Sequence, residues 1–191
     1  MLYVVGREVR GVTYLDNIMY AVGNKSSTIL LFNTDTLSLL DVDINVKGMK
    51  DPYDIVVCRH DRQLYVAEWN CIWRVSVDDH SYVKWLTTES STDRFFVDTL
   101  SLTSRRLLVM SLVPRTVRQY STTNKELLCV VQLPQYVFLL HAVETTHNTF
   151  VISHRGTSQD KEQDAVSELF RFCHVLQHLY HTVINAVKTV A

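Results

Sequence analysis

The chain has 191 residues, of which 47% are hydrophobic and 20% charged, and its formal net charge is −1. This composition predicts a packed core and excludes a largely disordered chain, and the near-neutral charge argues against a dedicated nucleic-acid binder. The first residues do not follow the pattern of a signal peptide, and no stretch has the roughly 18 uninterrupted apolar residues of a membrane span, so we expect a cytoplasmic protein.

Short apolar segments recur along the chain about every 43 residues. The segments MYAV, LYVA, LLVM and TFVI are separated by steps of 45, 43 and 42 residues, measured between the equivalent positions Tyr20, Tyr65, Leu108 and Phe150. In the first three units one apolar segment precedes this position and two more follow it, with turn residues such as Asp16–Asn17 between them. Segments rich in β-branched and aromatic residues and bounded by Asn, Asp and Ser are typical of strands and hairpins.

The predicted strands fall into four units along the chain. The first unit has strands at 11–15, 19–22, 28–32 and 37–44. The second has strands at 54–58, 64–67, 71–75 and 81–86, and the third at 98–102, 107–110, 116–120 and 126–133. The fourth unit retains only two, at 141–145 and 149–152.

Four antiparallel strands every 40 to 50 residues are typical of the blade of a β-propeller. A single sheet exposes two partly apolar faces, and stacking the sheets buries those faces. We therefore expect residues 1–156 to form propeller blades, at about 9–46, 51–87, 94–134 and, truncated, 139–156. The side chains expected to pack between blades in the second unit are Tyr65, Trp73, Tyr82 and Trp85.

The second unit contains three characteristic segments, Asp51–Ile55 (DPYDI), Leu64–Glu68 (LYVAE) and Ile72–Val75 (IWRV). It resembles a repeat of the NHL family, and the first unit, with IMYAVGNKSSTILLFNTDT, resembles the related YVTN repeat. The resemblance covers about residues 9–156 and implies a six- or seven-bladed propeller that most often serves as a binding scaffold. Some members of the family bind RNA, protein or small ligands, and a few relatives are metal-dependent lyases or hydrolases. Because only about three and a half blades are visible, we expect a fragment of a longer propeller.

One face of such a propeller carries the loops between second and third strands and the links between blades, where binding residues concentrate. The loop between Glu68 and the third strand of the second unit is two residues shorter than the loops at the equivalent place in units one and three. This tight turn is expected to push Trp69 outward, although the ring could instead fold over the neighbouring blade. Glu68 stands at the aspartate position of the family's repeat, and the resemblance implies that it ties the turn to backbone amides; contact with a ligand is the alternative. The predicted partner-binding residues are Lys25, Tyr53, Trp69, Asn70 and Arg115.

Two alternatives to a binding scaffold follow from other residues. Asp54, Asp98 and His141 stand at equivalent points of three consecutive innermost strands, and three such donors converging on one axis could hold Ca²⁺ or Zn²⁺. They could equally cap the start of each strand. The third unit also carries a group of cations that suggests RNA binding, namely Arg105, Arg106, Arg115, Arg118 and Lys125. No GxSxG, HExxH or P-loop motif is present, so no catalytic residue and no other cofactor is predicted.

The last part of the chain has a different pattern. From residue 157 there is no Gly or Pro, and apolar residues repeat at a spacing of three and four. They are Val166, Leu169, Cys173, Leu176, Tyr180, Val183, Val187 and Val190. This heptad pattern predicts an amphipathic α-helix within the tail 157–191.

Together these patterns predict an all-β, partial β-propeller of four-stranded antiparallel blades, followed by a C-terminal amphipathic α-helix. The leading function is a non-catalytic scaffold that binds a protein partner, or further copies of itself, through the loop face. A metal-assisted hydrolase or lyase that uses the channel residues, and an RNA-binding protein, are the alternatives.

Overall fold

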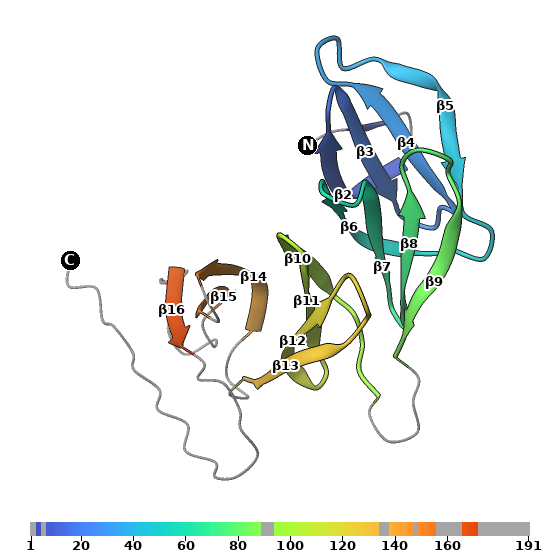
Figure 1. Ribbon diagram of the computed structural model, residues 1–191. Coiled ribbons are helices and arrows are strands. Elements are labelled where there is room, and N and C mark those ends of the chain that lie inside the picture. The colour runs from blue at the N-terminus through green and yellow to red at the C-terminus, as the bar shows by residue number, and fades with distance from the viewer. Residues whose placement is uncertain are drawn as a thin grey trace.

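The computed structural model describes residues 3–4, 7–88, 94–133, 138–146, 149–155 and 166–171. Every element in this part of the chain is a β-strand, and the strands form four antiparallel sheets in chain order (Figure 1). None of the described residues forms a helix of the length and apolarity needed to cross a membrane. The expected all-β architecture of four-stranded antiparallel sheets is therefore confirmed.

The sheets, called blades 1 to 4, each pair their strands in sequence order. Blade 1 contains β1 (Tyr3–Val4), β2 (Arg7–Leu15), β3 (Ile18–Gly23), β4 (Thr28–Asn33) and β5 (Leu39–Asn45). Blade 2 contains β6 (Pro52–Cys58), β7 (Gln63–Glu68), β8 (Cys71–Ser76) and β9 (Tyr82–Thr87). Blade 3 contains β10 (Thr99–Thr103), β11 (Arg106–Leu112), β12 (Arg115–Ser121) and β13 (Leu127–Gln132). Blade 4 contains β14 (Phe138–Thr146), β15 (Thr149–Arg155) and β16 (Val166–Arg171).

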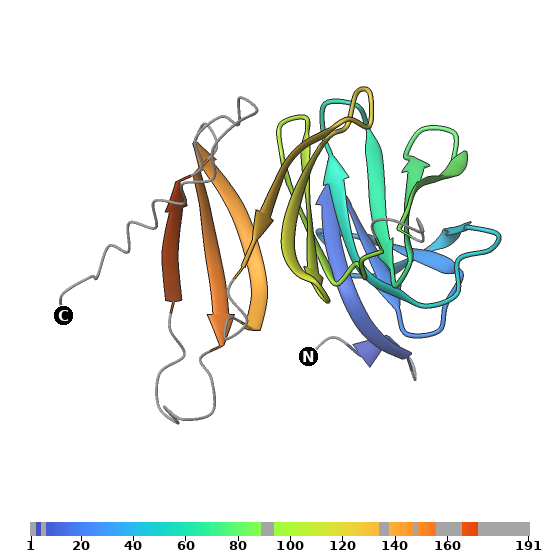
Figure 2. The same ribbon diagram turned by 90° about the horizontal axis from the view of Figure 1, so that it is seen from below.

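The four blades follow one another along an arc, with blades 1 and 4 at its two ends (Figures 1 and 2). The first long strand of each blade, β2, β6, β10 or β14, is the innermost strand, and the innermost strands of successive blades contact each other. The arrangement therefore has the radial order of propeller blades over the described residues.

Apolar side chains fill the spaces between successive blades. Leu107 and Val109 of β11 point toward blade 2, whereas the alternating residues Leu108 and Met110 point toward blade 4, and all four are fully buried. This alternation is what a strand with two covered faces requires. Full burial of each such side chain contributes about 1.5–3 kcal/mol relative to exposure.

The aromatic residues predicted to pack between blades do so. Tyr65 and Trp85 face blade 3, with ring centroids 5.1 Å apart in an edge-to-face arrangement. Trp73 and Tyr82 face blade 1, with ring centroids 6.2 Å apart. Edge-to-face pairs of this kind add stability beyond the area they bury, so blade 2 is held on both of its faces by an aromatic pair.

The fourth unit is shifted by one residue from the predicted alignment. Tyr20, Tyr65 and Leu108 are each the third residue of the second strand of their blade, and each packs toward the following blade. Phe150 is the second residue of β15 and packs toward blade 3, the preceding one. The position equivalent to Leu108 is therefore Val151.

The predicted C-terminal helix covers residues of which the structure describes only β16. Those six residues form a strand that pairs with β15, so for them the helical prediction is not met. The rest of the predicted helix lies outside the described residues.

Gly11 marks the closest approach between two innermost strands. A Cβ atom at this position would lie 2.8 Å from the backbone nitrogen of Ile55 and 2.9 Å from the Cα of Asp54. Backbone atoms cannot move aside as a flexible side chain can, so β2 and β6 pack this closely only because residue 11 lacks a side chain.

We predict that Gly11→Ala lowers the free energy of unfolding by about 1–3 kcal/mol, because the added methyl forces blades 1 and 2 apart. Gly23→Ala is the matched control, since its Cβ would meet a single backbone oxygen, that of Glu8, at 3.1 Å. Urea denaturation, monitored by tryptophan fluorescence, measures the unfolding free energy of both variants. Equal stability of the two would contradict the close-packing account.

Candidate interaction surface on the loop face

The loop face carries four segments that converge beside blade 2. They are the link 46–51 before β6, the Trp69–Asn70 turn between β7 and β8, the link 94–98 before β10, and the Val113–Pro114 turn between β11 and β12. Two backbone hydrogen bonds join the last three, from the amide of Val97 to the carbonyl of Trp69 (3.1 Å) and from the amide of Phe96 to the carbonyl of Val113 (3.2 Å). Segments distant in sequence thus form one continuous surface.

The carboxylate of Glu68 lies beneath this surface and forms hydrogen bonds with several of its segments. Its Oε1 accepts hydrogen bonds from the backbone amides of Lys50 and of Asp51 (2.9 Å). Its Oε2 accepts hydrogen bonds from the indole Nε1 of Trp73 (2.6 Å) and from the thiol of Cys71 (3.4 Å). The side chain of Glu68 is buried, so one carboxylate joins the link from blade 1 to the body of blade 2.

These contacts keep Glu68 charged despite its burial. Burial alone would raise the pKa of the carboxyl group. Hydrogen bonds from the Trp73 indole, the two backbone amides and the Cys71 thiol outweigh burial and hold the pKa of Glu68 below its usual value. The sequence-based expectation that Glu68 ties the turn to backbone amides agrees with this geometry.

Trp69 forms the centre of a row of three aromatic rings. Its ring centroid lies 4.3 Å from that of Phe96, at an interplanar angle of 31°, and 6.5 Å from that of Tyr53. The side chain nevertheless remains 53% exposed. Both readings of Trp69 from the sequence therefore hold in part, because the ring leans on the neighbouring link and still faces solvent.

A cation closes the row at each end. The guanidinium of Arg10 lies 4.8 Å from the ring centroid of Tyr53, and that of Arg94 lies 5.2 Å from the ring centroid of Phe96. Arg10 also forms an ion pair of 3.1 Å with Asp51, whose backbone amide bonds to Glu68. Cation–π contacts of this kind contribute about 0.5–1 kcal/mol when exposed. The row Arg10–Tyr53–Trp69–Phe96–Arg94, called the aromatic row below, spans blade 1, blade 2 and the link to blade 3.

The predicted partner-binding residues lie at different distances from this row. Tyr53 and Trp69 belong to it, and the backbone amide of Lys25 donates to Asp51 Oδ1 (3.0 Å) at its Arg10 end. Asn70 shares the turn with Trp69, and its carbonyl accepts from the amide of Thr88 (2.9 Å). Arg115 begins β12 on blade 3, where its carbonyl accepts from the amide of Leu133 (2.9 Å).

Sequence reasoning missed Phe96, Arg10 and Arg94. A signal existed for the first, since Phe95 and Phe96 stand next to each other just before an innermost strand. One of two adjacent residues there must point away from the core. Phe95 is buried and Phe96 is partly exposed. The two arginines are recognisable only from their positions over aromatic rings.

The three predicted channel residues interact electrostatically. Burial, as the largest cause, raises the pKa of Asp54, the charge of Asp98 raises it further, and His141 lowers it. Burial also raises the pKa of Asp98. Both carboxylate oxygens of Asp54 accept backbone hydrogen bonds, from Ile55 (2.8 Å) and from Leu100 of β10 (2.8 Å). Asp54 thus caps its own strand and ties blade 2 to blade 3.

No cluster of three or more His, Cys, Asp or Glu side chains suited to a metal ion occurs within the part of the chain that the structure describes. The cations of blade 3 are also dispersed. Arg118 is buried with its guanidinium 4.2 Å from the ring centroid of Phe95, and Arg106 forms an ion pair with Glu144 (2.9 Å). The remaining three lie in different loops or at different strand ends.

No family model matches the chain, and no curated protein matches it. Solved structures do. The chain is similar to the hydrazine synthase of Kuenenia stuttgartiensis, with a TM-score of 0.61 and 13% identity over 84% of this chain and 49% of that one. It is similar to U3-55K, with a TM-score of 0.61 and 10% identity over 89% and 54%. It is also similar to the computationally designed Ika8 protein, with a TM-score of 0.57 and 11% identity over 86% and 46%.

The chain thus spans about half the length of these structures. At such low identity the likeness concerns the fold alone. Together with the four-stranded antiparallel sheets, it fits a propeller-like all-β architecture.

We predict that Glu68→Gln lowers the free energy of unfolding at pH 7 by about 1–3 kcal/mol, the contribution of hydrogen bonds to a charged group. A carboxyl with a lowered pKa stabilises the fold above the unfolded value, about 4.3, and this contribution is lost as the pH falls through the lower folded value. The difference in unfolding free energy between wild type and Glu68→Gln should therefore become smaller below about pH 4. Denaturant unfolding at a series of pH values measures it.

Glu126→Gln is the control, since Glu126 is exposed and accepts one side-chain hydrogen bond, from Asn124 (3.0 Å). This variant should unfold as wild type does at every pH. A loss of unfolding free energy in Glu68→Gln that is the same at every pH would rule out a stabilising role for the charge of Glu68.

Proposed function

We propose that this chain is a non-catalytic scaffold of the NHL/YVTN type and binds a protein partner through its loop face, with Trp69 as the main contact. The observation that carries the proposal is the half-exposed indole of Trp69, stacked on Phe96 and flanked by cations. Tryptophan and arginine are enriched among the residues that dominate binding energy at protein interfaces.

The turn that holds Trp69 supports this role, because it is fixed on both sides. The carbonyl of Trp69 accepts from Val97, and the carbonyl of Asn70 accepts from Thr88. Glu68 anchors the start of the same turn from the interior. A side chain on a fixed turn loses little conformational freedom on binding, and this favours affinity.

The surroundings of Trp69 favour a partner segment that is apolar and acidic. Lys25, Lys50 and Arg94 are exposed on this face. Val113, 61% exposed, adds an apolar surface next to Phe96. We therefore propose that the partner contributes an apolar or aromatic side chain to Trp69, with carboxylates beside it for these cations.

The repeat pattern supports assignment to the NHL/YVTN type. Pro52 begins β6, LYVAE forms most of β7, and IWRV lies within β8. Glu68 stands at the family's aspartate position and makes the contacts with backbone amides that the resemblance implies.

We predict that Trp69→Ala reduces recovery of the partner at least about tenfold, as expected for loss of a dominant interface residue. The measurement is quantitative mass spectrometry of proteins co-purified with the tagged chain from the cells that make it. Leu128→Ala is the control, because Leu128 is 44% exposed on the outer strand β13. Recovery that is the same for Trp69→Ala and wild type would contradict the proposal.

The same purified material distinguishes the other functions. Recovery of further copies of this chain alone would favour self-association. Ca²⁺ or Zn²⁺ retained through purification, and lost in Asp54→Asn, would favour the metal-assisted hydrolase or lyase. RNA bound with a steep dependence on salt would favour phosphate recognition by the cations of blade 3.

A further inference from the structure

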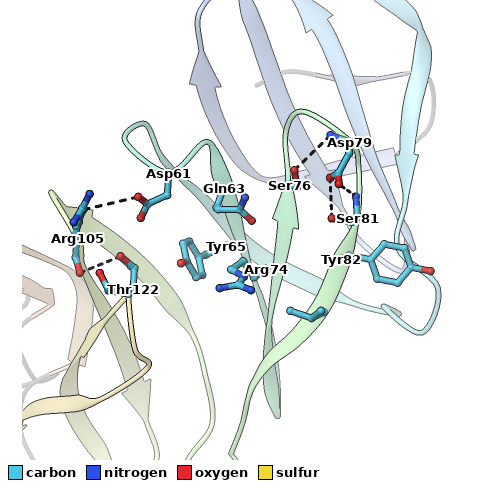
Figure 3. Close-up of a pocket in the computed structure, with 12 residues that line it drawn as sticks. Asp61, Gln63, Tyr65, Arg74, Ser76, Asp79, Ser81, Tyr82, Arg105 and Thr122 are labelled. Carbon is cyan, nitrogen blue, oxygen red and sulfur yellow. Dashed lines mark hydrogen bonds and ion pairs between the residues drawn. The ribbon is translucent and has the colours of Figure 1, made fainter.

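A pocket of about 520 Å³ opens on the face opposite the loop face, between blades 2 and 3 (Figure 3). Its walls are the side of blade 2 that faces blade 3 and the turns at the far end of both blades. Strand register explains the first wall, because Tyr65 pairs with Arg74, Arg74 with Val83, and Gln63 with Ser76, so these side chains share one face of the sheet. The volume lies within the range of small-molecule sites.

The lining is polar, with hydroxyl groups on both walls. Tyr65 belongs to the blade 2 wall and Thr122 to the blade 3 wall, where the hydroxyl of Thr122 donates to the carbonyl of Arg105 (3.2 Å). Burial, the largest cause, raises the pKa of Tyr65 to about 12, so its hydroxyl stays neutral and can donate at physiological pH. A pocket of this kind suits a polar ligand rather than an apolar one.

Two of the charged groups in the pocket neutralise each other. Asp61 lies 2.8 Å from the ring Nδ1 of His60, and this hydrogen bond lowers its pKa. Arg105 lies 3.9 Å from Asp61 and 2.7 Å from His60. Asp61, His60 and Arg105, at the edge of the pocket, therefore form their polar contacts with one another.

Two other charges have no opposite charge beside them. The side chain of Arg74 lines the pocket, and it makes no hydrogen bond or ion pair with any described residue. Asp79 accepts from the hydroxyl (2.8 Å) and the amide (3.1 Å) of Ser81. Side-chain hydrogen bonds from Ser76 and Ser81 lower the pKa of Asp79 to about 2, and no cation contacts it among the described residues.

The two uncompensated charges are separated along the pocket. Figure 3 shows Arg74 near the centre of the lining residues, and Asp79 toward the far end beside Ser76 and Ser81. Asp79 lies beside Ser76, since its backbone amide donates to the Ser76 hydroxyl (3.5 Å). Arg74 and Ser76 are two residues apart on β8, so their Cα atoms lie about 7 Å apart along the strand. The termini of a dipeptide lie at a similar separation, about 7 Å when the chain is extended.

We propose that this pocket binds a short zwitterionic ligand of the dipeptide class, whose carboxylate pairs with Arg74 and whose ammonium group pairs with Asp79. The guanidinium matches a carboxylate in a bidentate geometry. A doubly charged phosphate fits less well, because the ionised carboxylate of Asp79 lies in the same pocket.

The test is a titration of the ¹⁵N-labelled full chain with L-alanyl-L-alanine, followed by NMR chemical shifts. We expect saturable shifts at pocket residues. Arg74→Gln and Asp79→Asn should each weaken binding by about tenfold, the effect of losing one charge-assisted contact. Arg74→Lys, which keeps the charge but not the fork of donors, should lie between wild type and Arg74→Gln.

Two further ligands and one further variant make the test specific. N-acetyl-L-alanine lacks the ammonium group and L-alaninamide lacks the carboxylate, so each should bind more weakly than the dipeptide. Lys84→Gln removes a charge from the other side of blade 2, where Lys84 lies over Trp73, and should leave binding unchanged. Unfolding midpoints equal to that of wild type show that the variants are folded.

Three results would overturn the proposal. They are an absence of shifts with the dipeptide at millimolar concentration, equal binding by Arg74→Gln and wild type, and equal binding of N-acetyl-L-alanine and the dipeptide. Trp69 lies on the opposite face, so none of these results affects the test of partner recovery through Trp69.

Discussion

A four-stranded sheet with two apolar faces is stable in water only if both faces are covered, and this constraint organises the described blades. Each space between successive blades is filled by buried side chains of both neighbours. Blade 2 shows the rule most fully, because Trp73 faces blade 1 and Tyr65 faces blade 3. The innermost strands β2 and β6 lie so close together that a Cβ atom at residue 11 would collide with the backbone of Ile55.

The same packing gives the two faces of the arc different chemistry. On the loop face, the buried carboxylate of Glu68 joins the link 46–51 to the turn that carries Trp69, and the neighbouring link supplies Phe96. At the opposite face, the blades separate enough to leave a polar pocket with Arg74 and Asp79 in its walls. One face therefore carries an exposed aromatic row, and the other a polar pocket.

The sequence predicted the strands of blades 1 to 3 well, because alternation of apolar residues and a fixed repeat length are local properties. It misaligned Phe150 by one residue, since a shift of one reverses the face of a strand and blade 4 has few strands to compare. It singled out Trp69 from a shortened loop and Glu68 from the resemblance to the NHL repeat. It could not find Arg10 or Arg94, whose roles depend on rings that other segments bring to them.

The claim that the loop face recognises a partner is tested most directly by site-specific photo-crosslinking in the cells that make the protein. A benzophenone amino acid replaces Val113, exposed beside Phe96, or Leu128 on the outer strand β13. The account predicts a crosslinked protein from position 113 that disappears when Trp69→Ala is added, and little or none from position 128. Crosslinks confined to position 128, or unchanged by Trp69→Ala, would contradict it.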